Sequence, residues 1–173
     1  MSEATPRRVI ELVTSIEKFL QIPYWFTVRQ SLAMSGVPTV ESDGLQYEPA
    51  HVLVFDQEYQ LIGELDPVRL TDALVESLPD ELRHAPSNRQ PETLSAHWSR
   101  LVREGNDRLD QLTVSDVMIP IGPPLVPDDC VLRAFYALAS APNTVLPVIR
   151  DGQLLGVVRR ADILAELLIQ TFT

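Results

Sequence analysis

The chain has 173 residues, 45% of them hydrophobic and 22% charged, which is enough for one substantial core or for two small modules that share one. A formal net charge of −10 repels phosphate backbones, so a nucleic-acid polymer is excluded as the expected partner. No apolar run approaches the roughly 18 residues that cross a bilayer, and Glu11 interrupts the apolar stretch that a secretory signal would need. We therefore expect a cytoplasmic protein without a membrane span.

The cysteine and histidine residues do not predict a disulfide or a metal site. The single cysteine, Cys130, cannot form an internal disulfide, and its flanks predict a small apolar side chain in the first turn of a helix. The three histidines, His51, His84 and His97, lie far apart and lack the spacing of a metal site. We expect no bound metal.

The first half of the chain predicts helices around a strand pair. Apolar residues fall on one helical face near the N-terminus, which predicts a docked N-terminal helix: Val9, Leu12, Val13, Ile16 and Leu20. The stretch "FTVRQSLAMS" predicts a second helix, and "GVPTVESDGLQYEP" predicts a surface loop. Val52 to Gly63 then reads as strand, turn and strand, followed by a helix in "DPVRLTDALVESL".

A linker with three prolines, Pro79, Pro86 and Pro91, separates this half from the next. It ends in an amphipathic stretch whose apolar face holds Leu94, Trp98, Leu101, Val102, Leu109 and Leu112. We expect an ordered linker helix in which Trp98 packs on a neighbouring module rather than binding a ligand.

The second half repeats the first. "VLVFDQEYQLIG" and "VLPVIRDGQLLG" align without a gap at an offset of 93 residues (Gly63 to Gly156), with five identical positions. "DCVLRAFYALAS" resembles "FTVRQSLAMS" at an offset of 103 (Val28 to Val131), and "VSDVMI" echoes "VIELVT". One copy has too few elements to cover its own sheet, so we expect two copies packed face to face around a pseudo-twofold axis, with a cleft between them.

These stretches resemble the cystathionine-beta-synthase-type (CBS) domain, which is usually found as a tandem pair called a Bateman module. The ordered set "TVSDVMIP", "LVPDDCVLRAFYALA" and "VLPVIRDGQLLGVVRRADILAEL" carries the resemblance in the second copy, and "HVLVFDQEYQLIGELDPVRLTDAL" carries it in the degenerate first copy. The resemblance implies an α/β (α+β) fold with two pseudo-symmetric βαββα-type repeats packed sheet to sheet. We place the first repeat with its N-terminal helix at residues 1–78, the helical linker at 79–112 and the second repeat at 113–173.

The resemblance also implies a ligand. Paired CBS domains commonly bind adenosine-containing ligands such as AMP, ADP, ATP or S-adenosylmethionine in the cleft between the repeats, and no further cofactor is implied. The family's signature, glycine, two apolar residues, Ser or Thr, two further residues and Asp, becomes Gly156 to Asp162 here, with Arg159 in place of the hydroxyl residue. Asp162 would hold the ribose hydroxyls, while its ordinary alternative role is compensation of the helix dipole.

The start of the last helix is unusual in its own right. Arg159 stands where a capping side chain is expected and cannot accept a hydrogen bond, so the helix start, flanked by Arg160, could take an anion. The alternative is that Arg159 and Arg160 are two solvated charges on an acidic protein, or are paired with Asp or Glu across a dimer contact. In the first copy Asp66 is a good cap, Pro67 suits the first helical position and Arg69 replaces the ribose aspartate, so that copy should be closed to phosphates.

The family pattern supplies further wall residues of the site, for which core packing is the alternative. They are Met118, Ile119, Pro120, Thr144, Leu146 and Pro147. Backbone groups near Ile119 and Leu146 could read the edge of an adenine.

Two functions remain open: a regulatory sensor of an adenosine-containing ligand that signals to an unidentified effector protein, and a ligand-independent dimerisation or scaffold protein. An enzyme is not expected, because no nucleophile with a base partner and no phosphate loop is present. The last helix carries more apolar residues than one sheet covers, which predicts a homodimer through the CBS helices: Ile163, Leu164, Leu167 and Leu168.

Overall fold

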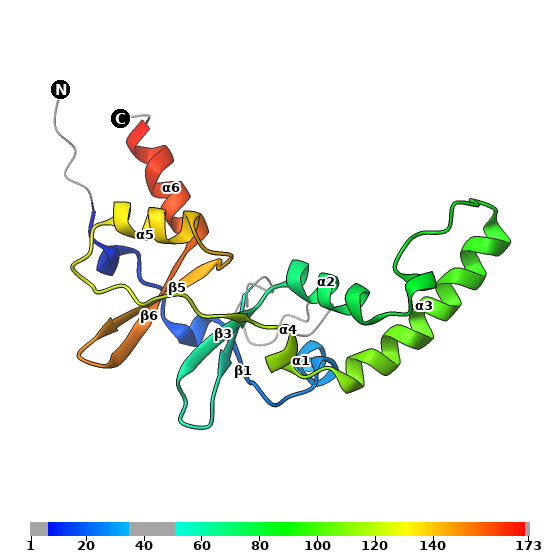
Figure 1. The fold of residues 1–173 in the computed structure, drawn as a ribbon. Helices are drawn as coiled ribbons and strands as arrows, with labels where there is room; N and C mark the ends of the chain where they lie inside the picture. The colour runs from blue at the N-terminus through cyan, green and yellow to red at the C-terminus, as the bar shows by residue number, and fades with distance from the viewer. Residues whose placement is uncertain (1–6, 35–50, 172–173) are drawn as a thin grey trace.

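A computed structural model describes residues 7–34 and 51–171 of the chain. The first part contains the 3-10 helices η1 (Val9–Leu12) and η2 (Ile16–Lys18), β1 (Leu20–Pro23), α1 (Val28–Met34), β2 (Val52–Phe55), β3 (Leu61–Leu65), α2 (Pro67–Ser77), η3 (Asp80–Leu82) and α3 (Pro91–Gln111). The second part contains α4 (Val114–Val117), β4 (Ile119–Pro120), α5 (Val131–Ala139), β5 (Val145–Arg150), β6 (Gln153–Arg159) and α6 (Arg160–Thr171). The structure is a mixed α/β fold with two sheets (Figure 1).

The predicted repeat is confirmed at the level of its strands and helices. At the offset of 93 residues, β2 and β3 correspond to β5 and β6, and each antiparallel pair leads into a helix, α2 or α6. The Asp151-Gly152 turn has positive φ at both residues, 52° and 79°, as a tight hairpin requires. In the first copy Tyr59 adopts φ 58° at the position that Gly152 occupies in the second. The predicted loop at residues 36–49 lies outside the described residues.

The two halves exchange their leading segments. Ile119 of β4 pairs with Glu64 in the first sheet, and Thr14 pairs with Val157 in the second through N–H···O bonds of 2.8 and 3.0 Å. Glu64 and Val157 are equivalent at the offset of 93 residues, so the exchange is pseudo-symmetric. Residues 9–14 therefore pack in the second half, although the sequence boundaries at 78 and 112 remain predictions.

Alternation along the strands separates three cores. Val52 and Val54 of β2 face the first half's helices, while Leu53 and Phe55 face the other sheet. The residues between the sheets are Phe19, Leu53, Phe55, Val145 and Val157. The second half's own core contains Val9, Leu125, Val131, Ala134, Leu138, Leu146, Val148, Val158 and Ile163. The expected packing of sheet on sheet is thus present.

The expected single N-terminal helix is wrong. Residues 9–20 form two 3-10 turns that end in β1, because their backbone groups are used by other parts of the chain. Val9 N–H donates to the carbonyl of Asp129, and Thr14 exchanges bonds with Val157, which a continuous α-helix would not permit. The segment still docks, since Val9 is fully buried.

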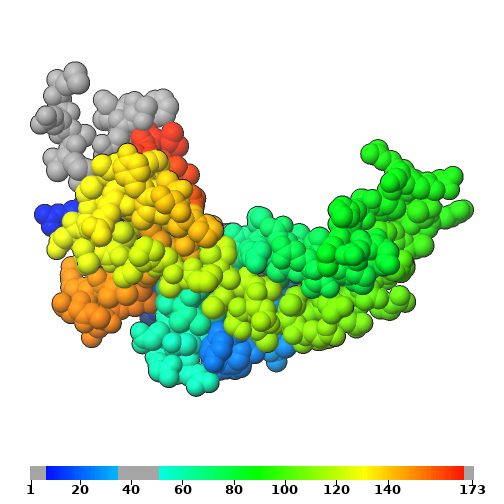
Figure 2. Space-filling view, viewed as in Figure 1, coloured from blue at the N-terminus to red at the C-terminus, as the bar shows by residue number. Residues whose placement is uncertain are grey.

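The linker helix is confirmed as α3, but the role of Trp98 is not. Figure 1 shows α3 projecting away from the two sheets: the proline-containing segment runs outward from α2, and α3 runs back beside it. The space-filling view shows the same projection as an arm (Figure 2). Trp98 lies on this arm and is 64% exposed, so it does not pack on a neighbouring module. None of the described helices combines the length and apolar character that crossing a membrane requires.

Candidate functional site

Two charged side chains at the start of α6 are paired with each other. Arg159 is the last residue of β6, and its Nε and Nη2 atoms donate to the two carboxylate oxygens of Asp162 at 2.8 and 2.7 Å. Both side chains are mostly buried, at 23% and 22% exposure. The prediction from the sequence that both residues lie at the helix start is correct. However, Arg159, which was expected to bind an anion, is bonded to Asp162, which was expected to bind a ribose.

Arg160 lies on the other side of the helix start. Its backbone N–H donates to the carbonyl of Thr144 at 2.7 Å, and its Nη2 donates to the carbonyls of Ala141 and Asn143 at 3.0 and 2.7 Å. The guanidinium therefore links the connection between α5 and β5 to the start of α6. The side chains of Arg159 and Arg160 thus have different hydrogen-bond partners, and their role toward an anion remains a prediction.

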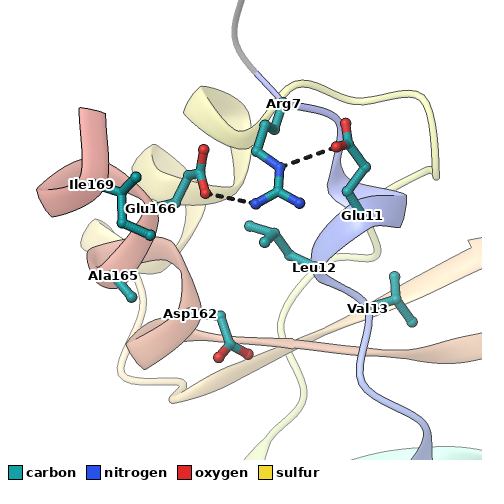
Figure 3. Close-up of a pocket in the computed structure, with 8 residues that line it drawn as sticks. All are labelled: Arg7, Glu11, Leu12, Val13, Asp162, Ala165, Glu166 and Ile169. Carbon is teal, nitrogen blue, oxygen red and sulfur yellow. Dashed lines mark hydrogen bonds and ion pairs between the residues drawn. The ribbon is translucent and has the colours of Figure 1, made fainter. Parts of the chain in front are cut away.

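An open surface pocket of about 290 Å³ lies beside Asp162 (Figure 3), and it is slightly smaller than typical small-molecule pockets. It lies between the N-terminal segment and α6, and its lining consists of Arg7, Glu11, Leu12, Val13, Asp162, Ala165, Glu166 and Ile169. We call it the α6 pocket. One wall comes from the leading segment of the first half, so the pocket exists because of the exchange of segments.

Arg7 bridges two carboxylates of the α6 pocket. Its Nη1 lies 2.9 Å from Glu166 Oε2 and its Nε 3.0 Å from Glu11 Oε2, as the dashed lines in Figure 3 show. The hydrogen bond to Glu166, and then that to Glu11, raises the pKa of Arg7, while the backbone N–H of Arg8 and then the Arg7 guanidinium lower the pKa of Glu11. Glu166 is 6% exposed, so Arg7 compensates a buried charge.

The other predicted site residues lie in different parts of the structure. Gly156 lies next to the pocket wall, since a Cβ there would be 2.7 Å from Val13 Cγ1. Ile119 and Pro120 join the first sheet and do not line the α6 pocket, and the Pro120 carbonyl accepts a bond from Asn143 Nδ2 at 2.9 Å. Leu146 is buried in the second core.

Thr144 and Pro147 also have structural contacts. The Pro147 carbonyl accepts from Leu125 N–H at 2.8 Å. Thr144 binds the buried carboxylate of Glu64. The predicted wall residues thus do not form one surface around Asp162, and their roles toward a ligand remain predictions.

Sequence reasoning missed the N-terminal contribution to the site. No local pattern marks Arg7, Glu11 or Glu166 as site residues, because Arg7 and Glu166 are far apart in the chain. The echo between "VIELVT" and "VSDVMI" was the available signal: a leading segment that pairs with the opposite copy brings Arg7 to α6.

The first copy has the closed helix start that its sequence predicts. Asp66 caps α2 by accepting from the N–H groups of Val68 and Arg69 at 2.6 and 3.3 Å, and Pro67 is the first helical residue. Within residues 7–34 and 51–171, no group of three or more His, Cys, Asp or Glu side chains has a metal-binding arrangement.

Solved structures share this arrangement over nearly the whole chain. A CBS domain-containing protein from Bacillus anthracis is 20% identical, with 95% of this chain and 94% of that chain covered and a TM-score of 0.61. The CBS-pair protein CBSX2 from Arabidopsis thaliana is 16% identical, with 98% and 99% covered and a TM-score of 0.58. This chain has the CBS-pair fold. A structure of CBSX2 in complex with AMP matches this CBS pair at 17% identity, over 94% and 97% of the two chains, with a TM-score of 0.57.

Sequence comparison adds little to this assignment of the CBS-pair fold. A family described as a protein of unknown function, DUF705, matches residues 4–86, which is less than half of the chain. No curated protein matches the sequence.

Proposed function

We propose that this CBS pair is a non-catalytic regulatory module that binds an adenosine-containing ligand in the α6 pocket and signals to a partner protein. The observation that carries the proposal is the position of Asp162: it lines a cavity between the two halves' segments, at the first turn of α6, in the fold that CBSX2 uses when bound to AMP. A ribose diol is a suitable partner for a carboxylate at such a place.

The pair with Arg159 sets a condition on binding. Both oxygens of Asp162 accept from Arg159, so hydroxyl groups of a ligand compete with the guanidinium for the same carboxylate. Arg159 does not itself line the α6 pocket, so a ligand compensates for this loss only if it carries an anionic group that extends past Asp162 to the guanidinium. This favours a nucleoside phosphate or a carboxylate-bearing adenosyl compound over adenosine alone.

Thermal unfolding with AMP, ADP, ATP, S-adenosylmethionine and adenosine tests the proposal. A ligand at about 100 times its dissociation constant stabilises the folded state by about 2.7 kcal/mol. Asp162→Ala should abolish the shift in melting temperature. Arg159→Thr, which releases Asp162 and restores a hydroxyl, should tighten the binding of adenosine, which has no anionic group for Arg159, roughly three- to tenfold.

Arg69→Ala is the matched control, because Arg69 stands in the first copy where Asp162 stands in the second, and it should leave the ligand shift unchanged. A ligand shift that persists in a folded Asp162→Ala variant rules out the assigned site. Loss of the shift in Arg69→Ala would move the site to the first copy.

The second candidate function is a ligand-independent dimerisation or scaffold protein. Its support is an apolar face on the neighbouring helices α5 and α6, where Leu132, Tyr136, Leu164 and Leu168 are each about half exposed or more. If none of the five ligands stabilises the protein while it remains a dimer, this second function is the correct one.

A further inference from the structure

Three polar side chains from the two halves meet at the pseudo-twofold axis. Thr144, directly before β5, donates its backbone N–H to Glu64 Oε1 at 2.7 Å and its Oγ1 hydroxyl to Glu64 Oε2 at 2.8 Å. His51, directly before β2, has Nδ1 at 3.0 Å from Thr144 Oγ1. His51 and Thr144 are equivalent at the offset of 93 residues, so each half contributes the same position to this contact.

Glu64 is buried at the contact between the halves. It is 1% exposed, and it occupies the position at which the second copy has the apolar Val157. Burial raises the pKa of Glu64, and the hydrogen bonds from the backbone and side chain of Thr144 oppose this effect. A buried carboxyl group is tolerated when its oxygens are hydrogen-bonded, as they are here.

When Glu64 is ionised, the number of available protons determines the direction of the chain of hydrogen bonds. A carboxylate only accepts, and the Thr144 hydroxyl has one proton, which it gives to Glu64. The hydroxyl oxygen must then accept from His51, so the proton between them belongs to His51 Nδ1. In the reversed chain a protonated Glu64 would donate to Thr144, and Thr144 to an unprotonated Nδ1.

We propose that Glu64, Thr144 and His51 form a directed relay in which Glu64 holds His51 in its Nδ1-protonated form and positions Thr144 at the start of α6. The link to α6 is direct, because the Thr144 carbonyl accepts from Arg160 N–H at 2.7 Å. Glu64 is thus a positioning residue: through Thr144 it connects the first half to α6, the helix that contains Asp162. The proposal does not depend on whether Asp162 binds a ligand.

The groups next to the relay have contacts of their own. The charged group joined to Thr144 from α6 is Arg160, whose guanidinium is bonded to the carbonyls of Ala141 and Asn143. Phe19 packs edge-on against the His51 ring, with a centroid distance of 6.3 Å. Within the described residues, Glu64 is the carboxyl group that these hydrogen bonds connect to His51.

Nitrogen-15 NMR of the histidine rings in the full chain tests the proposal. The measurement is made well above histidine's ordinary pKa of about 6.5, so that neutral rings report which nitrogen holds the proton. We expect His51, assigned with a His51→Gln variant, to hold its proton on Nδ1. A wild-type His51 with its proton on Nε2 would overturn the proposal.

Glu64→Gln should reverse the relay. Its side-chain oxygen can accept from Thr144 N–H only if its NH₂ group faces the Thr144 hydroxyl, which must then donate to His51 Nδ1. His51 should therefore change to the Nε2-protonated form, while the signals of His84 and His97 stay unchanged. An unchanged His51 in a folded Glu64→Gln variant contradicts the proposal.

If Glu64→Gln does not fold, Thr144→Val tests whether Glu64 controls the position of the His51 proton. Removing the hydroxyl disconnects His51 from Glu64, so the Nδ1 preference should be lost, and Thr144→Ser should keep it. A His51 ring that keeps the Nδ1 proton in Thr144→Val would show that Glu64 does not control it.

Discussion

At Gly156 the absence of a side chain allows the two halves to approach closely. A Cβ at this position would lie 2.4 Å from the carbonyl oxygen of Thr14, and φ is 154°, a conformation that L residues rarely adopt. Gly156, which resembles the glycine of the CBS ligand signature in sequence, is therefore required here by the exchanged segment itself, whether or not a ligand binds. Its identity in the sequence is explained by packing.

Gly156→Ala should lower the free energy of unfolding by more than about 1 kcal/mol, because the methyl group displaces Thr14 and strains the backbone. Gly105→Ala is the control: a Cβ at this position in α3 meets nothing within 4 Å, so the variant should gain about 0.5–1 kcal/mol. Urea unfolding measures both. Equal effects of the two substitutions would contradict the packing role of Gly156.

Glu64 should make stability depend on pH. Burial raises its pKa in the folded state, so the folded chain binds this proton more tightly than the unfolded chain does. The stabilisation is complete below the ordinary glutamate pKa of about 4.3 and is lost as pH rises through the folded-state pKa. Wild-type protein should lose stability with rising pH over this window relative to Glu64→Gln. Parallel unfolding free energies of the two proteins across pH would rule this out.

At the scale of elements, the two equivalent helices begin in different ways. Asp66 caps α2 with its own carboxylate, whereas α6 follows an arginine that is paired with Asp162 in the first turn. The same fold position thus uses a conventional cap in one copy and an ion pair in the other. This difference was readable from the sequence, but the partner of Arg159 was not.

Asp66→Ala should destabilise the protein by about 1 kcal/mol, because two N–H groups at the start of α2 lose their acceptor. Asp72→Ala removes the same charge from an exposed position within α2 and should change stability by less than about 0.5 kcal/mol. Thermal or urea unfolding compares the two variants. If Asp72→Ala destabilises the protein as much as Asp66→Ala does, the effect comes from the loss of negative charge and not from the loss of the cap.

At the scale of the whole molecule, α6 leaves apolar surface uncovered. Ile163 is buried in the second core, but Leu164 and Leu168 are 49% and 60% exposed. An exposed apolar patch of this kind on a pseudo-symmetric body suits a self-complementary contact between two copies. The homodimer remains a prediction.

Leu164→Asp combined with Leu168→Asp should shift the protein from dimer to monomer in sedimentation equilibrium, because a charge cannot be desolvated in an apolar contact. Val68→Asp, at an exposed apolar position of α2, should leave the dimer intact. A wild-type chain that sediments as a monomer at all concentrations refutes the predicted interface. A dimer unaffected by the double substitution places the contact elsewhere.

The repeat, the strand pairs, the helices that follow them and the linker helix could be predicted from the sequence alone, because periodicity and turn residues act over a few neighbouring positions. The closed start of α2 and the unusual start of α6 could be predicted in the same way, since caps depend on adjacent residues. The tertiary structure decided that the leading segments cross to the opposite half, that Arg7 reaches Glu166 and that Glu64 meets Thr144 and His51. These contacts join residues far apart in the chain, and they depend on how two sheets pack, which no local pattern specifies.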